Sequence, residues 1–420
     1  MPETPYKTYP YRWVELAVFA VINLTIQILW ICFAPITGPA AKFYGVSDLQ
    51  IGLLAMSFMI VYVPLSIPIS WMIDTWGYRK SVSIGAVIMG LFGILRGIFA
   101  SDYALVLICT LGIAAAQPFM LNAITTIAAK WFPIQERATA SGLSMVAGFI
   151  GIAIGQVTSP LLFKLLGIPA MLLIFGTIAA ASSVLFLVFT REAPPTPPCP
   201  EGQATRALML TGLKTMLRMR DIWLLLVVFL FGMGVFNGVT TWIEDILRPK
   251  GFSPAMAGEM GGLLLIGGIV GAIVIPTLSD KFRMRKAFLL VGMIFAIPGI
   301  VGIALFSATL AIATSMFLLG FFLVSLAPIG YQYAAEITYP APEGTSNGLL
   351  NLAGQISVVF IFAMEAMKGA DGSFTTSLVV LAVLMVVNVL LIALLKESTL
   401  IRSPLADKAG AVPGPASNIA

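Results

Sequence analysis

The sequence predicts an all-α membrane protein in which twelve transmembrane helices form two pseudo-symmetric six-helix bundles. Of its 420 residues, 59% are hydrophobic and only 10% are charged, which is not the balance of a soluble domain of this size. Apolar runs that approach the ~20 residues of a spanning helix recur along the chain. Backbone polar groups in hydrocarbon must be satisfied internally, so these runs are predicted to be helices rather than open strands.

Two stretches of the sequence repeat, which indicates a duplicated membrane unit. The loop at 74–80, Asp-Thr-Trp-Gly-Tyr-Arg-Lys, is repeated 206 residues later at 280–286, where the Asp, the Arg and the Lys occupy the same positions. A second stretch, 132–143, resembles 339–349, which has one residue fewer. Internal repeats set the architecture of a chain. They predict here two tandem copies of one six-helix unit.

The apolar runs also set the predicted boundaries. Residues 1–190 are the N-terminal bundle and 222–395 the C-terminal bundle, separated by a cytoplasmic linker at 191–221. A cytoplasmic tail at 396–420, rich in Pro, Ala and Gly, is predicted to be disordered. The twelve spans are expected at roughly 13–36, 51–73, 82–100, 103–130, 138–163, 168–190, 222–247, 253–279, 287–307, 309–336, 344–367 and 374–395.

The linker has two parts of different character. Its proline-rich start, 191–200, cannot be helical. The following stretch, 204–220, sets leucines and methionines against Lys and Arg, which predicts a basic amphipathic helix at the membrane surface. An ordinary solvated linker is the alternative.

The positive charges predict the orientation. With the N-terminus inside, eighteen of the 24 Lys and Arg residues fall in inner loops and tails, and six fall outside. Both termini are therefore expected in the cytoplasm of a multi-pass cell-membrane protein. The net charge of +5 does not indicate nucleic-acid binding, because the basic residues lie in short interhelical loops.

The duplicated loop resembles the signature loop of the major facilitator superfamily, which has a small residue, then Asp, then Gly-x-Arg-Lys. Asp74, Gly77, Arg79 and Lys80 match this pattern, although Ser70 stands where the family usually has Gly. In the second copy Asp280, Arg285 and Lys286 match, while Pro276 and Met284 replace the glycines. The resemblance covers essentially the whole chain and implies the major facilitator fold.

Three further stretches are similar to one branch, the feline leukaemia virus subgroup C receptor-related transporters. They are 43–46, 62–71 and above all 336–350, Glu-Ile-Thr-Tyr-Pro-Ala-Pro-Glu-Gly-Thr-Ser-Asn-Gly-Leu-Leu. This resemblance implies uniport-like movement of choline, ethanolamine or related small amines. Haem export has also been attributed to the branch.

Charged residues at the inner ends of the spans are candidates for gating. In the resembled fold the loop with Asp74 packs near the start of span 11, whose free N–H groups and positive dipole attract a carboxylate, and Asp280 would do the same for span 5. Such contacts bias the state that is shut on the cytoplasmic side. The alternative is that these charges only fix topology. The candidate gating residues are Asp74, Arg79, Lys80, Asp280, Arg285, Lys286, Glu136, Glu336 and Glu343.

The middle of the predicted spans contains neutral polar and aromatic residues but no carboxylate, which would have indicated proton coupling. A neutral aromatic pocket binds an ammonium group through ring quadrupoles, at about 0.5–2 kcal/mol per ring. Single amides within spans also commonly serve as hydrogen bonds between helices. The polar residues are Asn23, Gln27, Gln117, Asn122, Gln156, Asn237, Asn351 and Gln355, and the aromatic residues are Trp30, Phe149, Phe236, Trp242, Tyr331 and Tyr333.

Only some residues of the branch's substrate site are matched in this sequence. Trp30 matches the aromatic residue that resembled members use against the ammonium, and Gln355 matches a substrate-facing amide. Asn237 stands where the branch has an aromatic residue, and Phe149 where it has a glutamine, so either a ring has moved or the substrate differs. The predicted substrate-binding residues are Trp30, Gln355, Asn237, Phe149, Gln117, Gln27 and Asn122.

The sequence therefore predicts a facilitative transporter that moves a small organic solute, such as a choline-like amine, by alternating access. The alternative is a proton-coupled exporter or antiporter of an organic compound such as haem or a drug-like molecule, using Glu244 or Glu336. A transport-like receptor is a third reading. No histidine, paired central carboxylates or activated nucleophile indicates an enzyme. The expected partners are the solute and the bilayer, with no nucleic acid, cofactor or metal, and the chain is expected to be a monomer.

Asp74→Asn should slow turnover roughly fivefold or more while changing solute affinity less, because the loss falls on one conformational state. Initial uptake rates and equilibrium binding, measured on the same preparation, separate the two effects. Wild-type turnover in this variant would remove Asp74 from gating.

Overall fold

The computed structural model describes residues 7–198, 216–338 and 343–398, and within them every secondary-structure element is helical. The linker helix predicted at 204–220 and most of the predicted tail lie outside these ranges. The first half contains α1 (Tyr11–Ile31), η1 (Ala34–Ile36), α2 (Thr37–Tyr44), α3 (Asp48–Trp76), α4 (Tyr78–Ile98), α5 (Tyr103–Leu121), α6 (Ile124–Trp131) and α7 (Ile134–Phe189). The second half contains α9 (Arg220–Thr241), α10 (Ile243–Leu247), η3 (Arg248–Lys250), α11 (Pro254–Phe282), α12 (Arg285–Leu305), α13 (Thr309–Thr338), α14 (Glu343–Ile356), α15 (Val358–Ala366) and α16 (Thr375–Leu394).

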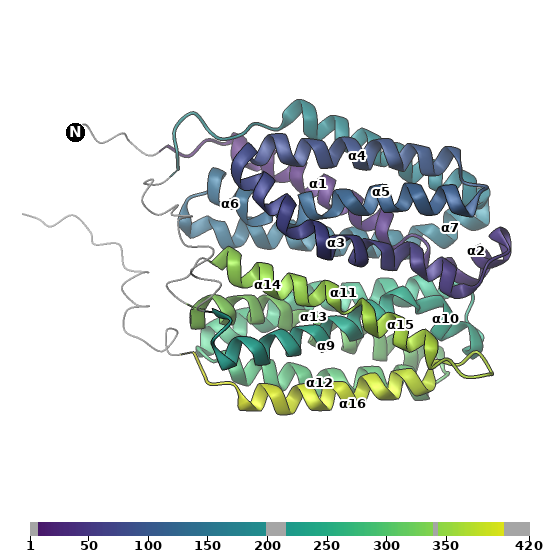
Figure 1. The fold of residues 1–420 in the computed structure, drawn as a ribbon. Coiled ribbons are helices and arrows are strands. Elements are labelled where there is room, and N and C mark those ends of the chain that lie inside the picture. Colours follow the sequence, from purple (N-terminus) through teal and green to yellow (C-terminus); the bar gives the residue numbers. More distant parts are fainter. Residues whose placement is uncertain (1–6, 199–215, 339–342, 399–420) are drawn as a thin grey trace, which may run out of the picture.

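The two halves lie against each other, with α1 to α7 on one side and α9 to α16 on the other (Figure 1). Within the described ranges, eleven helical segments are long and apolar enough to cross a membrane. One of them lies in α7, whose 56 residues would extend roughly 84 Å if straight, far more than a ~30 Å hydrocarbon core. Gly167, with φ 78° and ψ 172°, turns the chain back inside α7, so this segment supplies two spans. The predicted twelve-helix fold is confirmed.

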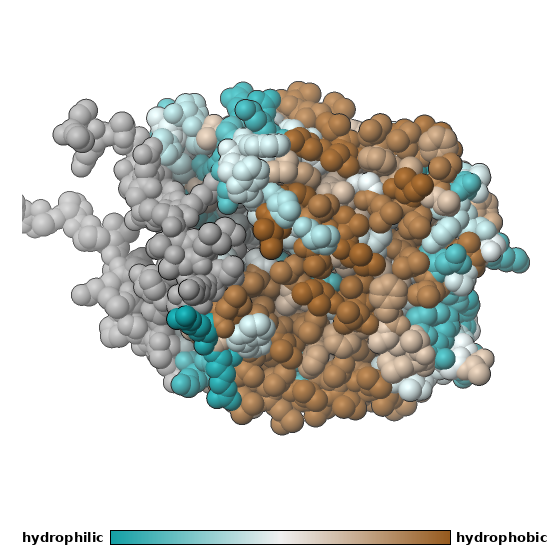
Figure 2. Space-filling model, in the orientation of Figure 1, coloured by the Kyte–Doolittle hydropathy of each residue, from teal (hydrophilic) through white to brown (hydrophobic). Residues whose placement is uncertain are grey.

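The surface is that of a protein surrounded by lipid. Hydrophobic residues form a broad band across the visible face, and hydrophilic residues gather at its two ends (Figure 2). Side chains such as Ile67, Leu165 and Leu310 are mostly exposed although they are aliphatic. In lipid this exposure has no hydrophobic penalty, so it does not indicate a missing partner.

Several spans are broken, which matters for the site. The first span breaks after Ile31, near Pro35, and the fourth breaks at Asn122, shortly after Pro118. The seventh breaks at Trp242 and the eleventh at Ser357. A break leaves backbone carbonyls without helical partners, so other protein groups must donate to them in the absence of water.

The duplicated loop is held by a carboxylate that the sequence did not single out. Glu192 accepts hydrogen bonds from the backbone N–H groups of Tyr78 (3.1 Å) and Arg79 (2.7 Å) at the start of α4, and pairs with Lys130. Gly77 has φ 94°, a backbone conformation that requires glycine, and a Cβ there would come 2.7 Å from Glu192 and displace its carboxylate.

The second copy of the loop uses the same device with different residues. Glu397 accepts from the N–H groups of Arg285 (2.8 Å) and Lys286 (3.1 Å). The assignment of Met284 to the place of the glycine is wrong, because Arg283 takes the left-handed conformation, with φ 54°. Arg283 also stands 206 residues after Gly77, the interval of the repeat. The positive φ is therefore kept at this position although the glycine is not, while ψ changes from 161° at Gly77 to 44° at Arg283.

Candidate functional site

The path between the halves is closed at one end, near α2 and α10, by a tryptophan. Trp242 of the second half is fully buried and donates from its indole to the carbonyl of Ile361 (3.1 Å). Its ring lies against Gly52 of α3, where a Cβ would come 2.3 Å from the ring. No larger side chain fits at Gly52 while the halves are this close, so this contact forms an apolar closure between them.

Six charged residues, which we call the outer charge cluster, lie at the same end. Asp48 of the first half pairs with Arg248 (3.3 Å) and Lys368 (3.0 Å) of the second half. Arg248 also pairs with Glu244 (3.2 Å) and with Asp245. The cluster consists of Asp48, Glu244, Asp245, Arg248, Glu365 and Lys368. Because Asp48 lies on the other half from Arg248 and Lys368, its two ion pairs form only while this end is shut.

Two carboxylates of the outer charge cluster are buried. Glu244 and Asp245 are 2% and 1% exposed, and Glu244 also accepts from the backbone N–H of Gly38 across the halves (2.9 Å). Burial raises the pKa of Glu244, which follows the seventh span, while the Gly38 N–H and Arg248 act in the opposite direction. Removing one partner of a buried pair leaves an uncompensated charge and is costly.

Gln156 joins the halves below this cluster. It is fully buried in α7 and donates to the carbonyl of Thr240, the penultimate residue of α9 (3.0 Å). A Cβ on Gly258 would come 2.3 Å from the Gln156 carbonyl oxygen, so α7 and α11 are in near backbone contact. The amide thus satisfies a carbonyl at the break in the seventh span.

Looser packing is found at the opposite ends of the spans. Gly142 of α7 and Gly348 of α14 are related by the repeat interval, and at neither would a Cβ come within 4 Å of another described residue. At the outer end, Gly38, Gly52 and Gly258 would each meet the other half at less than 3 Å. The structure is therefore shut on the outer side.

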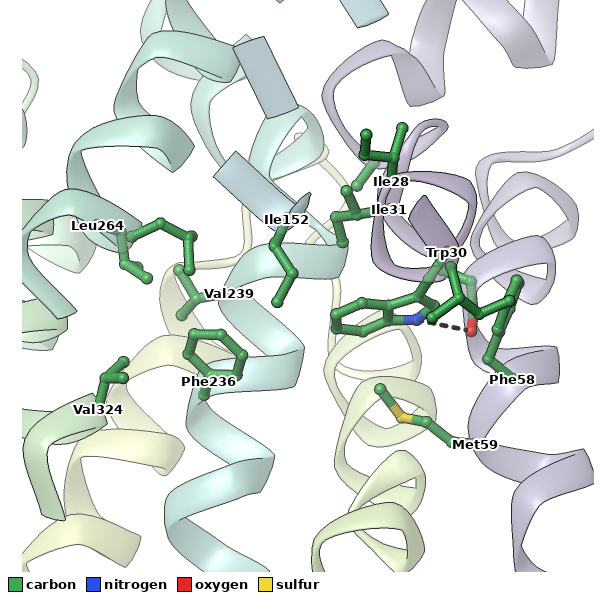
Figure 3. Packing of buried hydrophobic residues seen from close by; sticks show 14 of the residues in the cluster. Ile28, Trp30, Ile31, Phe58, Met59, Ile152, Phe236, Val239, Leu264 and Val324 are labelled. Carbon is green, nitrogen blue, oxygen red and sulfur yellow. Dashed lines mark hydrogen bonds between the residues drawn. The ribbon is translucent and has the colours of Figure 1, made fainter. Parts of the chain in front are cut away.

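Trp30 lies at the end of α1, one residue before the break in the first span. It is 6% exposed, and its indole donates to the carbonyl of Ala55 in α3 (3.1 Å). In Figure 3 the ring lies close to Met59 and Phe58 and extends toward the side on which Ile152 and Phe236 lie. Trp30 therefore lies inside the protein, and its predicted contact with a solute stays a prediction.

A pair of glutamines lies on the same half. Gln117 donates to Gln27 Oε1 (3.2 Å), and Gln117 is 3% exposed with its own Oε1 lacking a hydrogen bond. Nearby on α7, Phe149 meets Phe236 of the second half edge-to-face at 6.3 Å. The structure thus brings Gln27 and Gln117 together and places Phe149 at the contact between the halves.

Two predicted residues of the second half differ in their environment. Asn237 is 3% exposed and donates to Ser357 Oγ (3.1 Å) and toward the Gly354 carbonyl (3.5 Å), at the break in the eleventh span. This arrangement favours a role between helices, and its role in binding stays a prediction. Gln355 is half-buried and makes no side-chain hydrogen bond to a described residue. Its amide is therefore available to a solute.

Two tyrosine–asparagine pairs continue toward the inner side. Asn122 accepts from Tyr62 (2.6 Å) and donates to Ser66 and Ser70 at the break in the fourth span. In the second half Tyr331 donates to Asn351 (2.5 Å). Asn122 therefore lies in a satisfied polar network within its own half.

Five of the predicted gating residues of the inner face form contacts within their own half. Glu136 pairs with Arg12 (3.2 Å), and Arg285 pairs with Glu336 (3.0 Å) and Asp280. Lys286 donates to the Ala393 carbonyl (2.7 Å). Asp74, Arg79 and Lys80 are exposed at the end of α3 and the start of α4, and Glu343 begins α14. Their predicted contacts across the halves belong to the state shut on the inner side and stay predictions.

The main feature that sequence reasoning missed is the outer charge cluster. The spacing of Glu244 and Asp245 before Arg248 is a signal of local ion pairing on a helix. Nothing local connects them to Asp48, about 200 residues away. Glu192 was missed for the same reason.

Two six-helix halves around one path, shut at one end by contacts between them, define a membrane transporter of small solutes. The chain belongs to the Major Facilitator Superfamily, which matches residues 19–362 and 246–413.

Curated relatives confirm the branch. The chain is 30% identical over 387 residues to solute carrier family 49 member A3 of Danio rerio, covering 88% of this chain and 81% of the relative. It is also 30% identical over 413 residues to the choline/ethanolamine transporter FLVCR1 of Felis catus, covering 92% and 73%. A bacterial homologue of the human lysosomal transporter Spinster, solved inward-facing and unoccupied, shares the fold with a TM-score of 0.75 at 18% identity, over 96% of this chain and 99% of the other.

Asp48→Asn should weaken the outer closure, because it removes the carboxylate that joins the two halves. Spin labels at Ser101 and Ser307, exposed on equivalent outer loops, would report the change after the native cysteines are replaced. We expect a longer-distance population to increase about fivefold, as expected for a loss of about 1 kcal/mol.

Asp371→Asn is the matched control, because Asp371 is an exposed outer carboxylate whose only hydrogen bond to a described residue is to Ser373 of its own loop. Equal distance distributions for Asp48→Asn and Asp371→Asn would contradict the closure role.

Proposed function

We propose that this transporter moves a small organic cation, of the choline or ethanolamine type, down its gradient by alternating access. The observation that carries the proposal is the position of Trp30 at the broken end of α1, beside the contact between the halves. A ring at that point would meet an ammonium group through its quadrupole. The names of the relatives that transport choline and ethanolamine support this substrate class.

The polar residues near Trp30 suit a solute without a fixed counter-ion. Gln117 donates to Gln27, but its own Oε1 accepts no hydrogen bond from a described residue. The Gln355 side chain makes no hydrogen bond to a described residue either, and none of these three glutamines carries charge. A cation held by rings and neutral dipoles binds without the desolvation of a buried ion pair. Such a site releases its solute readily, which suits facilitated movement.

The proposed cycle uses the two closures in turn. With the outer charge cluster and Trp242 in contact across the halves, solute exchanges with the inner side. Breaking these contacts and forming the predicted ones at Asp74 and Asp280 would open the outer side. The protein is proposed to act as a monomer in the cell membrane. Both termini are proposed to lie in the cytoplasm, and the excess of Lys and Arg in the inner loops supports this orientation. The linker at 191–221 would connect the two moving bundles.

Trp30→Leu and Trp30→Phe form the decisive pair of variants. Both fill most of the buried space, but only phenylalanine keeps an aromatic ring. Choline binding to purified protein should weaken roughly 30-fold in Trp30→Leu, the ratio that corresponds to about 2 kcal/mol for one ring, and less in Trp30→Phe.

Trp71→Leu provides the control, because Trp71 is 58% exposed on the outside of the bundle. Wild-type choline affinity in folded Trp30→Leu would exclude Trp30 from the site.

Proton-coupled exchange of an organic compound is a second candidate, favoured by Glu244. Its raised pKa in the shut state means that this state binds a proton more readily than one in which the carboxyl meets water. The shut state would therefore gain stability as pH falls through the range between the raised and the ordinary value. Glu336 pairs with Arg285 and offers a weaker case.

Uptake into proteoliposomes with and without a pH gradient separates the two functions. The facilitative proposal expects equal final solute levels on both sides under either condition. Accumulation that collapses with a protonophore, and that Glu244→Gln abolishes, would replace it with proton coupling.

A further inference from the structure

Arg96, in the last turn of α4, is completely buried within the first half. It donates from Nη1 to the carbonyl of Leu29 (3.2 Å) and from Nη2 to Cys32 Sγ (3.7 Å), while Nε has no partner. No described Asp or Glu forms an ion pair with it. An arginine remains charged in any protein environment, so an unpaired buried guanidinium in a membrane span requires a compensating group.

The compensation comes from the broken end of α1. This helix ends at Ile31, and Cys32 is its C-terminal cap. Pro35 has no N–H to donate to the carbonyl of Ile31, and Leu29 lies in the same last turn of α1, where the carbonyls of a helix lack donors from within it. The end of a helix carries partial negative charge on its free carbonyls, and a cation there is stabilised. Arg96 thus caps a helix to which it does not belong, at a break that lies inside the bundle.

The capped carbonyl is adjacent in sequence to Trp30. The indole of Trp30 is fixed from the other side by its hydrogen bond to Ala55 of α3 (3.1 Å), the bond drawn in Figure 3. The backbone of α1 is therefore held by α4 while the ring is held by α3. Losing the first contact would let the last turn of α1 shift, and the ring would shift with it.

We propose that Arg96 is a positioning residue that fixes the break in α1 and so aims the Trp30 ring at the solute. This inference deepens the proposed function and rests on it for the role of Trp30. Arg96 does not touch the solute path itself, since the guanidinium is fully buried among Leu29, Cys32 and their neighbours. Its effect is expected on affinity rather than on the rate of the conformational change.

Arg96→Met and Arg96→Lys test the proposal. Methionine fills a comparable volume without charge, so that the protein can fold without an unpaired ion. We expect Arg96→Met to raise the KM for choline uptake about tenfold with little change in Vmax, as partners that orient a ligand group typically do. Lysine keeps the charge and should recover part of the affinity, and it keeps the test available if the methionine variant does not fold. Arg218→Gln, at an exposed arginine, should leave both constants unchanged.

Hydrogen exchange provides a readout that does not depend on any solute. Backbone amides at 29–37 should exchange faster in Arg96→Met than in wild type, while peptides from α16 should not change. An unchanged KM and unchanged exchange in folded Arg96→Met would overturn the proposal. Faster exchange at 29–37 combined with wild-type choline affinity in Trp30→Leu would uphold the positioning of α1 by Arg96 and overturn the proposed function instead.

Discussion

In hydrocarbon, a carbonyl freed by a break in a helix must find its donor within the protein, and this constraint organises the centre of the molecule. Arg96 donates to Leu29 at the break in the first span, and Gln156 donates to Thr240 at the break in the seventh. Asn237 donates to Ser357 Oγ and toward the Gly354 carbonyl at the break in the eleventh span. In each case a long polar side chain from another helix replaces the water that a soluble protein would use.

This constraint also separates the central polar residues into two groups. Gln156 and Asn237 use their amides at the breaks in the seventh and eleventh spans, and Asn122, at the break in the fourth span, uses its amide on Tyr62, Ser66 and Ser70 of α3. Gln27, Gln117 and Gln355 are not used in this way, and part of their hydrogen-bonding capacity remains free among the described residues. Residues of the second group are the better candidates for a solute, because binding there would not compete with the architecture.

The closure on the outer side combines an apolar contact, which depends on shape, with ion pairs, which depend on opposite charges. The contact between Trp242 and Gly52 depends on shape and buries an aromatic ring. The outer charge cluster depends on partners that lie on opposite halves, since Asp48 faces Arg248 and Lys368. Both are lost if the halves separate by a few ångströms, so closure is cooperative. Motion of rigid halves about a central site is the general behaviour of such folds.

The loop pattern identified Gly77 as the glycine of the first loop, but it did not identify the residue that takes its place in the second loop. The pattern assigned Met284, but the positive φ is found at Arg283, which caps α11 through the carbonyls of Ser279 and Asp280. Trp30 and Gln355 were found through resemblance, and the structure places them inside and half-buried. Arg96 was one of the six basic residues that the sequence placed on the outer side, and nothing more was predicted of it, because its partners, the Leu29 carbonyl and Cys32 Sγ, lie at the end of another helix.

The sequence by itself determined that the chain is a duplicated bundle of membrane helices, because apolar length and the repeat interval are local properties of the chain. It also determined the neutral character of the mid-depth polar residues. Only the tertiary structure decided which of these residues cap broken helices and which charges join the two halves. Those decisions depend on contacts between residues such as Asp48 and Arg248, which are brought together by packing and by no local pattern.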